Sequence, residues 1–89
     1  MGKRRSVIRQ VINRLLMSGR PGDYTIVYID RGPTSPSGLG GVSASRVVAV
    51  SEWAMTLDDG TIIPLHRVVE VRDRSGAVVW RRAGREGRG

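Results

Sequence analysis

The 89-residue sequence contains no cysteine, one histidine, one lysine and four aromatic residues. The lack of cysteine excludes disulfides and thiolate zinc sites, and a single histidine makes a structural metal site unexpected. No apolar run approaches the roughly 20 residues that span a bilayer. The basic start is followed by an amphipathic pattern rather than by the apolar stretch of a signal peptide. We therefore expect a cytoplasmic protein with no membrane, metal or cofactor partner.

Positive charge is plentiful, with a formal net charge of +7, but it is concentrated at the two ends. Residues 1–5 carry three basic side chains, and residues 6–80 are nearly balanced, with eight basic and seven acidic residues. We predict a basic N-terminal tail at 1–5, a single domain at 6–82 and a disordered Arg/Gly tail at 83–89. Flexible basic ends attract any polyanion without reading its sequence.

The first element is predicted to be an amphipathic helix over residues 6–18. Its apolar residues follow the i, i+1, i+4, i+5 spacing of a helix face, and Ser6 can cap its start. Gly19 and Pro21 end it. Residues 24–30 (YTIVYID) are typical of a strand, and residues 31–41 (RGPTSPSGLGG) predict a mobile loop.

The second half of the chain predicts short strands joined by turns. Ser43 can cap a helical turn before a short strand at residues 47–50. Residues 53–57 and 61–65 flank Asp58-Asp59-Gly60, which indicates a hairpin turn rather than a metal site. Residues 68–72 and 77–82 predict a second hairpin. We expect an α+β fold, with the N-terminal helix packed on a small antiparallel sheet or open barrel of four to five strands. No internal repeat is apparent.

Two short segments are the best candidates for a site. His66 is the only side chain that ordinarily titrates near neutral pH. Arg67 beside it offers a planar fork of donors that suits phosphate. Asp30-Arg31-Gly32 follows the first strand, where functional groups are often placed. The alternative is structural, with a half-buried histidine, a solvated arginine and a strand-terminal ion pair.

The aromatic side chains could stack on unpaired bases, but tryptophans more often fill a core. We expect Trp53 and Trp80 in the core. Tyr28 is the expected exception, because it shares a strand face with Asp30.

Several segments together resemble a known family. They are the helix, YTIVYIDRG, a variable loop, and LDDGTIIPLHRVVEVRDRSGAVVWRR, over about residues 5–82. This pattern is similar to that of a largely archaeal family of RNA cyclic-group-end recognition domains. The resemblance implies an RNA-binding module whose ligand is a terminal phosphate, including a 2′,3′-cyclic one. It also implies RNA-processing enzymes as partners.

By position, the resemblance implies a phosphate-binding site made by Tyr28, Asp30, Arg31, Gly32, His66 and Arg67. The sequence thus predicts a non-enzymatic RNA-binding domain. The two arginines would bind phosphate, His66 would donate to phosphate or ribose, and Tyr28 would stack on the last base. One alternative is a metal-independent RNA-end phosphoesterase that uses His66. Another is a protein-interaction module that docks a partner at a sheet edge near Pro64 and has no affinity for RNA.

Overall fold

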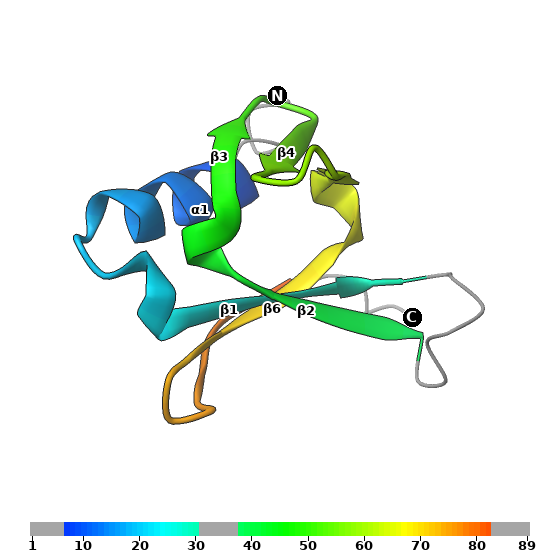
Figure 1. Cartoon of the computed structure of the whole chain (residues 1–89). Coiled ribbons are helices and arrows are strands. Elements are labelled where there is room, and N and C mark those ends of the chain that lie inside the picture. Colours follow the sequence, from blue (N-terminus) through cyan, green and yellow to red (C-terminus); the bar gives the residue numbers. More distant parts are fainter. Residues whose placement is uncertain (1–6, 31–37, 83–89) are drawn as a thin grey trace.

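The computed structural model describes residues 7–30 and 38–82 (Figure 1). The elements are α1 (Val7–Met17), η2 (Pro21–Asp23), β1 (Tyr24–Ile29), β2 (Leu39–Ser43), η3 (Ala44–Arg46), β3 (Val47–Val50), β4 (Ala54–Leu57), β5 (Ile62–Pro64), η4 (Leu65–Arg67), β6 (Val68–Asp73) and β7 (Val78–Arg81), where η marks a single 3-10 turn. The α+β class is confirmed, and the helix lies where it was predicted. No helix in the described part of the chain is long and apolar enough to cross a membrane.

The strands form two antiparallel sheets. One has the order β2-β1-β6-β7 and the other β3-β4-β5, so there are seven strands in two sheets rather than four to five in one. The chain passes between the sheets at η3 and η4. Each of these turns buries its first residue, Ala44 or Leu65, and thereby bends the backbone around the core.

Strand β2 begins inside the predicted loop, because residues 39–41 of the loop predicted at 31–41 belong to it. The sequence LGGVS is poor in strand formers, and yet it pairs with β1 in a regular register. Gly40 lies opposite Tyr28, and a Cβ atom built on Gly40 would be 2.7 Å from Cζ of Tyr28. Glycine is thus needed here because the tyrosine ring crosses its strand neighbour. The rest of the predicted loop, residues 31–37, lies outside the described residues.

Both predicted hairpins are confirmed and share one turn geometry. In the β4–β5 turn, the Leu57 N–H donates to Thr61 O (2.8 Å), and Gly60 has a φ of 91°. In the β6–β7 turn, the Asp73 N–H donates to Ala77 O (2.9 Å), and Gly76 again has a φ of 91°. Glycine adopts this left-handed backbone without the strain that a side chain would cause.

The fold contains an internal repeat that the sequence does not reveal. The segment β1-β2-η3-β3 corresponds to β4-β5-η4-β6 in its pairing. Each segment begins with a middle strand, β1 or β4, that pairs with the strand after it and with the last strand of the other segment.

The registers match residue by residue. Ile26 pairs with Val42 and Val71, and its equivalent Met55 pairs with Ile63 and Val50. The irregularity in the β1–β6 ladder at Val27/Tyr28 has a counterpart in the β3–β4 ladder at Val47/Ala49. The longest run of sequence identity is at the corners, where Arg-Val-Val occurs at residues 46–48 and again at 67–69.

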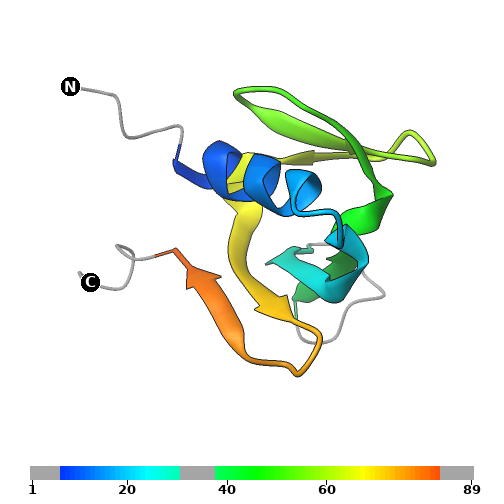
Figure 2. The same ribbon diagram turned by 90° about the vertical axis from the view of Figure 1, so that its left-hand side faces the viewer.

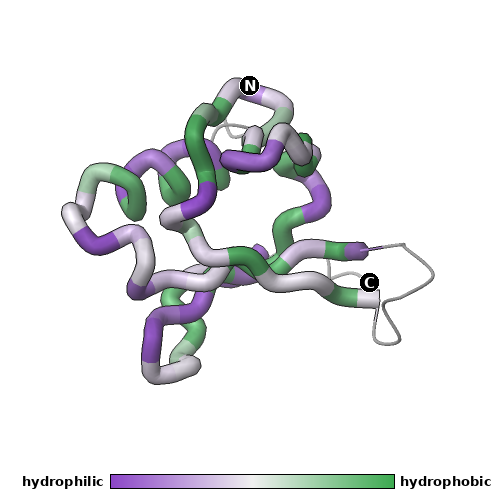
Figure 3. The backbone as a smooth tube through the Cα atoms, in the orientation of Figure 1, coloured by the Kyte–Doolittle hydropathy of each residue, from purple (hydrophilic) through white to green (hydrophobic). Residues whose placement is uncertain are grey.

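The core lies between the two sheets and the buried face of α1. Figure 2 shows α1 beside both sheets, and Figure 3 shows hydrophobic and hydrophilic stretches alternating along the helix. The buried hydrophobic residues are Ile8, Ile12, Leu15, Ile26, Val42, Ala44, Val47, Met55, Leu57, Ile63, Leu65, Val68 and Val71. Equivalent residues of the two repeats therefore contribute to a single core.

Candidate functional site

The described residues of the two predicted segments lie at the ends of neighbouring strands of the larger sheet: Asp30 directly follows β1, and His66 and Arg67 form η4 directly before β6. We call η4 and the strand ends next to it the η4 corner. Tyr28 pairs with Val68, near the end of β1 and the start of β6. This is the last pair in the β1–β6 register, and His66 and Arg67 directly precede Val68 in the chain. Arg31 and Gly32 were also predicted site residues, and they lie outside the described residues.

The turn that carries His66 and Arg67 is braced by a third basic residue, Arg82. Its Nε donates to Val68 O and its terminal nitrogen donates to Leu65 O, both at 2.9 Å. Its backbone N–H donates to Val69 O (2.9 Å). Hydrogen bonds from a charged donor are stronger than neutral ones, so Arg82 fixes the shape of η4. The guanidinium also lies 5.8 Å from the ring centroid of Trp80.

The internal repeat gives Arg67 an equivalent, Arg46, whose charge is fully engaged. Arg46 donates from Nε to Oδ1 of Asp58 (3.0 Å), and its terminal nitrogen lies 3.0 Å from Asp58 and 3.1 Å from Asp59. The hydrogen bond to Asp58, followed by the attraction of that carboxylate and the hydrogen bond to Asp59, raises the pKa of Arg46. This first corner is a neutralised structural contact.

The second corner lacks that neutralisation. The pairing registers make Ile29 and Asp30 the equivalents of Asp58 and Asp59. One carboxylate of the pair is therefore replaced by an apolar side chain. Within the described ranges, no carboxylate lies within ion-pair distance of Arg67. Arg67 is half-buried and His66 is exposed, so a cationic fork and an imidazole share a fixed turn.

The end of β1 is fixed by contacts with β2, on the side away from β6. Tyr28 is half-buried, packs against the core and crosses Gly40. Asp30 is half-buried, and its backbone N–H donates to Gly38 O (2.8 Å), which holds the strand end in place. The base-stacking role of Tyr28 stays a prediction.

The prediction that both tryptophans lie in the core is wrong for Trp53. Trp80 is half-buried against the core, but Trp53 is 75% exposed. Trp53 O accepts a hydrogen bond from the Leu65 N–H (2.8 Å), which places Trp53 directly beside η4. Sequence reasoning missed both Trp53 and Arg82 as neighbours of the corner. A signal existed for Arg82, because Trp80 and Arg82 are two residues apart on one strand and thus share a face.

The two aspartates of the β4–β5 turn serve structure, as predicted. The pKa of Asp59 is lowered, chiefly because its carboxylate accepts hydrogen bonds from Thr61 and, to a smaller extent, because Arg46 lies beside it. No group of three or more potential metal ligands occurs among the described residues.

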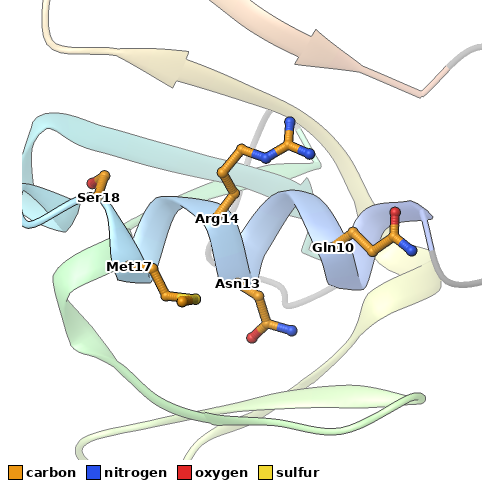
Figure 4. Close-up of a pocket in the computed structure, with 5 residues that line it drawn as sticks. All are labelled: Gln10, Asn13, Arg14, Met17 and Ser18. Carbon is orange, nitrogen blue, oxygen red and sulfur yellow. The ribbon is translucent and has the colours of Figure 1, made fainter.

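A shallow depression lies along α1, and its lining residues differ from those of the η4 corner. Its residues are Gln10, Asn13, Arg14, Met17 and Ser18, all from the helix and the residue that follows it (Figure 4). It shares no residue with the η4 corner and gathers only one charged side chain. The corner is thus the better candidate for binding an anion.

Comparison with known proteins shows the family to which the chain is related. A family model described as the MJ1316 RNA cyclic group end recognition domain matches residues 6–82. A UPF0248 protein of Aeropyrum pernix is 42% identical over 85 residues, which cover 92% of this chain and 84% of the relative. A UPF0248 protein of Pyrobaculum islandicum is 40% identical over 89% of this chain and 94% of the relative. One of Metallosphaera sedula is 36% identical over 84% and 91%. No solved structure matches the chain.

Proposed function

Because the chain belongs to the family of RNA cyclic group end recognition domains, we propose that it is a non-enzymatic module that binds phosphorylated or 2′,3′-cyclic-phosphate RNA ends. The bound group is the terminal phosphate, and the site is the η4 corner. Arg67 contacts phosphate oxygens and His66 donates to phosphate or ribose. Arg31 and Gly32 of the predicted site complete it from the segment after β1. Such a module serves RNA processing or repair together with enzymes that act on the end.

The observation that carries this proposal is the contrast between Arg67 and Arg46. The same turn, repeated in one domain, holds one arginine against two carboxylates and the other against none in the described part of the chain. Arg67 has no carboxylate partner in the described ranges, and a phosphate that accepts two hydrogen bonds from its guanidinium would be a strong one. Arg82 keeps the turn in shape when no ligand is bound.

The test compares one short RNA with three different 3′ ends: hydroxyl, monophosphate and 2′,3′-cyclic phosphate. Binding is measured with the full chain at moderate salt. We expect a clear preference for the phosphorylated ends, and we expect Arg67→Ala to remove it. A hydrogen bond between charged groups is worth about 1.5–3 kcal/mol, so the loss should be roughly 10- to 100-fold. Equal binding of the three ends by the wild-type protein would refute end recognition.

Arg46→Ala is the matched control. It removes an arginine from the equivalent position in the repeat, with the same loss of net charge. We expect it to leave the end preference intact, because Arg46 is already paired with Asp58 and Asp59. If both variants weakened binding equally, non-specific charge rather than a built site would explain the affinity.

The basic ends are tested separately through salt. Each phosphate neutralised by a basic residue of the protein adds about 0.7 to the slope of log K against log salt for single strands. Neutral substitutions in residues 1–5 and 83–89 should flatten that slope and leave the ratio between the three RNA ends unchanged. A changed ratio would move recognition from the corner to the ends of the chain.

A further inference from the structure

Trp53 is the one exposed aromatic side chain among the described residues, and its backbone is held firmly. Its N–H donates to Oγ of Ser51 (3.1 Å), and Ser51 Oγ also accepts from the Ala54 N–H (3.0 Å). The Ser51 N–H donates to Ala54 O (2.8 Å), which closes the turn. A large apolar ring is thus presented to solvent from a fixed turn, at 75% exposure. Such a ring is a preorganised contact surface.

The backbone of Trp53 adjoins η4. Through the 2.8 Å hydrogen bond from Leu65 N–H to Trp53 O, Trp53 flanks η4 on the side of the smaller sheet, while Tyr28 flanks it on the side of the larger one. Figure 2 shows the turn between β3 and β4 on the same side of the molecule as the end of β7. His66 follows Leu65 directly, so the imidazole and the indole come from adjoining backbone positions.

The internal repeat shows that exposure is not imposed by the fold. The registers make Tyr24 the equivalent of Trp53, and Tyr24 is half-buried and packs against the core. In the second repeat the larger and more apolar ring, that of Trp53, is exposed to solvent. It follows that the exposed ring occurs in the same repeat as Arg67, which has no carboxylate partner among the described residues.

We propose that Trp53 stacks on the base of the terminal nucleotide whose phosphate is bound at η4. This inference rests on the proposed function. A tryptophan face stacks on any base, because every base has a π-face. The neighbouring side chain, Glu52, is exposed and acidic, which suits an uncharged base and disfavours a second phosphate at this place. The site then divides into a cationic turn for the phosphate and an aromatic face for the base.

The experiment compares two 3′-phosphorylated RNAs, one complete and one whose terminal nucleotide lacks its base. Trp53→Ala should weaken binding of the complete RNA by roughly 5- to 150-fold, as expected for one lost stacking contact. It should change binding of the abasic RNA by less than about twofold. Trp53→Phe should recover part of the loss, because a smaller ring still stacks. Equal losses with both RNAs, or no loss with either, would overturn the assignment.

Ile62→Ala is the control for removing an exposed apolar side chain. Ile62 is 64% exposed on β5 of the same sheet and does not adjoin η4. It should bind both RNAs like the wild-type protein. A loss equal to that of Trp53→Ala would show that general apolar surface, not stacking, matters.

Tryptophan fluorescence gives an independent readout. In a Trp80→Phe background, Trp53 is the sole fluorescent tryptophan, and stacking on a base should quench it. Quenching by the complete RNA but not by the abasic RNA is the expected result. No quenching by any RNA would overturn the inference and leave a protein partner as the remaining occupant of this face.

The two proposals fail in different ways. If Arg67→Ala abolishes the end preference while Trp53→Ala has no effect, end recognition stands and base stacking is wrong. If the wild-type protein shows no end preference, the terminal position assigned to the stacked base is overturned, even if Trp53→Ala weakens binding of all RNAs.

Discussion

Replacing Arg82 by alanine should destabilise the domain more than replacing any other charged surface side chain by alanine. The variant removes two hydrogen bonds, at 2.9 Å each, from a cationic donor to the carbonyls of Leu65 and Val68. It also removes a guanidinium 5.8 Å from the Trp80 ring. Bonds to charged groups are worth about 1.5–3 kcal/mol each, and partial exposure reduces this to roughly 1 kcal/mol. With about 0.5 kcal/mol from the ring contact, the expected loss is about 2–3 kcal/mol.

That loss is large for a domain of this size. The free energy of unfolding is roughly 0.05–0.15 kcal/mol per residue, which corresponds to a total of about 4–13 kcal/mol for this chain. Urea unfolding followed by circular dichroism measures it. With an m-value of about 1 kcal/mol/M, the midpoint should fall by about 2 M. Arg82→Lys should recover only part, since an ammonium group cannot reproduce the planar fork of donors.

Arg81→Ala is the matched control from the adjacent position. Its side chain is mostly exposed and makes one long contact, 3.5 Å, to Glu70. We expect a change below about 0.5 kcal/mol. If Arg81→Ala and Arg82→Ala shift the midpoint equally, the idea that Arg82 braces η4 is refuted.

Three further predictions concern the strand pair, the second hairpin and the histidine. Gly40→Ala should cost about 1–3 kcal/mol of unfolding free energy because its Cβ would meet the Tyr28 ring, whereas Gly41→Ala, which meets no atom closer than 3.4 Å, should cost less. The pKa of Asp73 is lowered, chiefly because Oγ of Ser75 and then the backbone N–H of Ala77 donate to its carboxylate. Its contribution to stability is therefore present above about pH 4 and is lost as the pH falls further. Asp73→Asn keeps an acceptor that does not titrate, so this variant should lose less stability as the pH falls in an acid-unfolding experiment. If a protonated His66 contacts phosphate, affinity for a phosphorylated RNA end should fall as the pH rises through neutrality, and a dependence that persists in His66→Ala would assign it to another group.

The elements that local chemistry determines were predictable from the sequence. The helix, the capped turn at residues 44–46 and both glycine hairpins follow from periodicity and from turn residues. Strand β2 was not predictable, because its Gly40 is explained by the Tyr28 ring across the ladder and not by any local preference. The division into two sheets was also hidden, since pairing between distant strands leaves no local pattern.

The site was predictable in part. Residue types drew attention to His66 and Arg67, and the structure places them in η4, directly before the β6 residue that pairs with Tyr28. The importance of Arg67 emerges only from comparison with Arg46, which requires the repeat to be known. The exposure of Trp53 is an exception to the ordinary preference of tryptophan for the interior. Residue type alone could therefore not predict it.

The exchange of strands between the two repeats has a consequence for assembly of the chain. Strand β3 leaves the first repeat to pair with β4, and β6 leaves the second to pair with β1. Neither half can therefore complete its sheet from its own residues, and each would leave one edge of its middle strand, β1 or β4, unpaired. Cutting the chain in the turn at residues 51–53 should yield two fragments that are unfolded alone. They should fold when mixed, because each supplies the strand that completes the other's sheet.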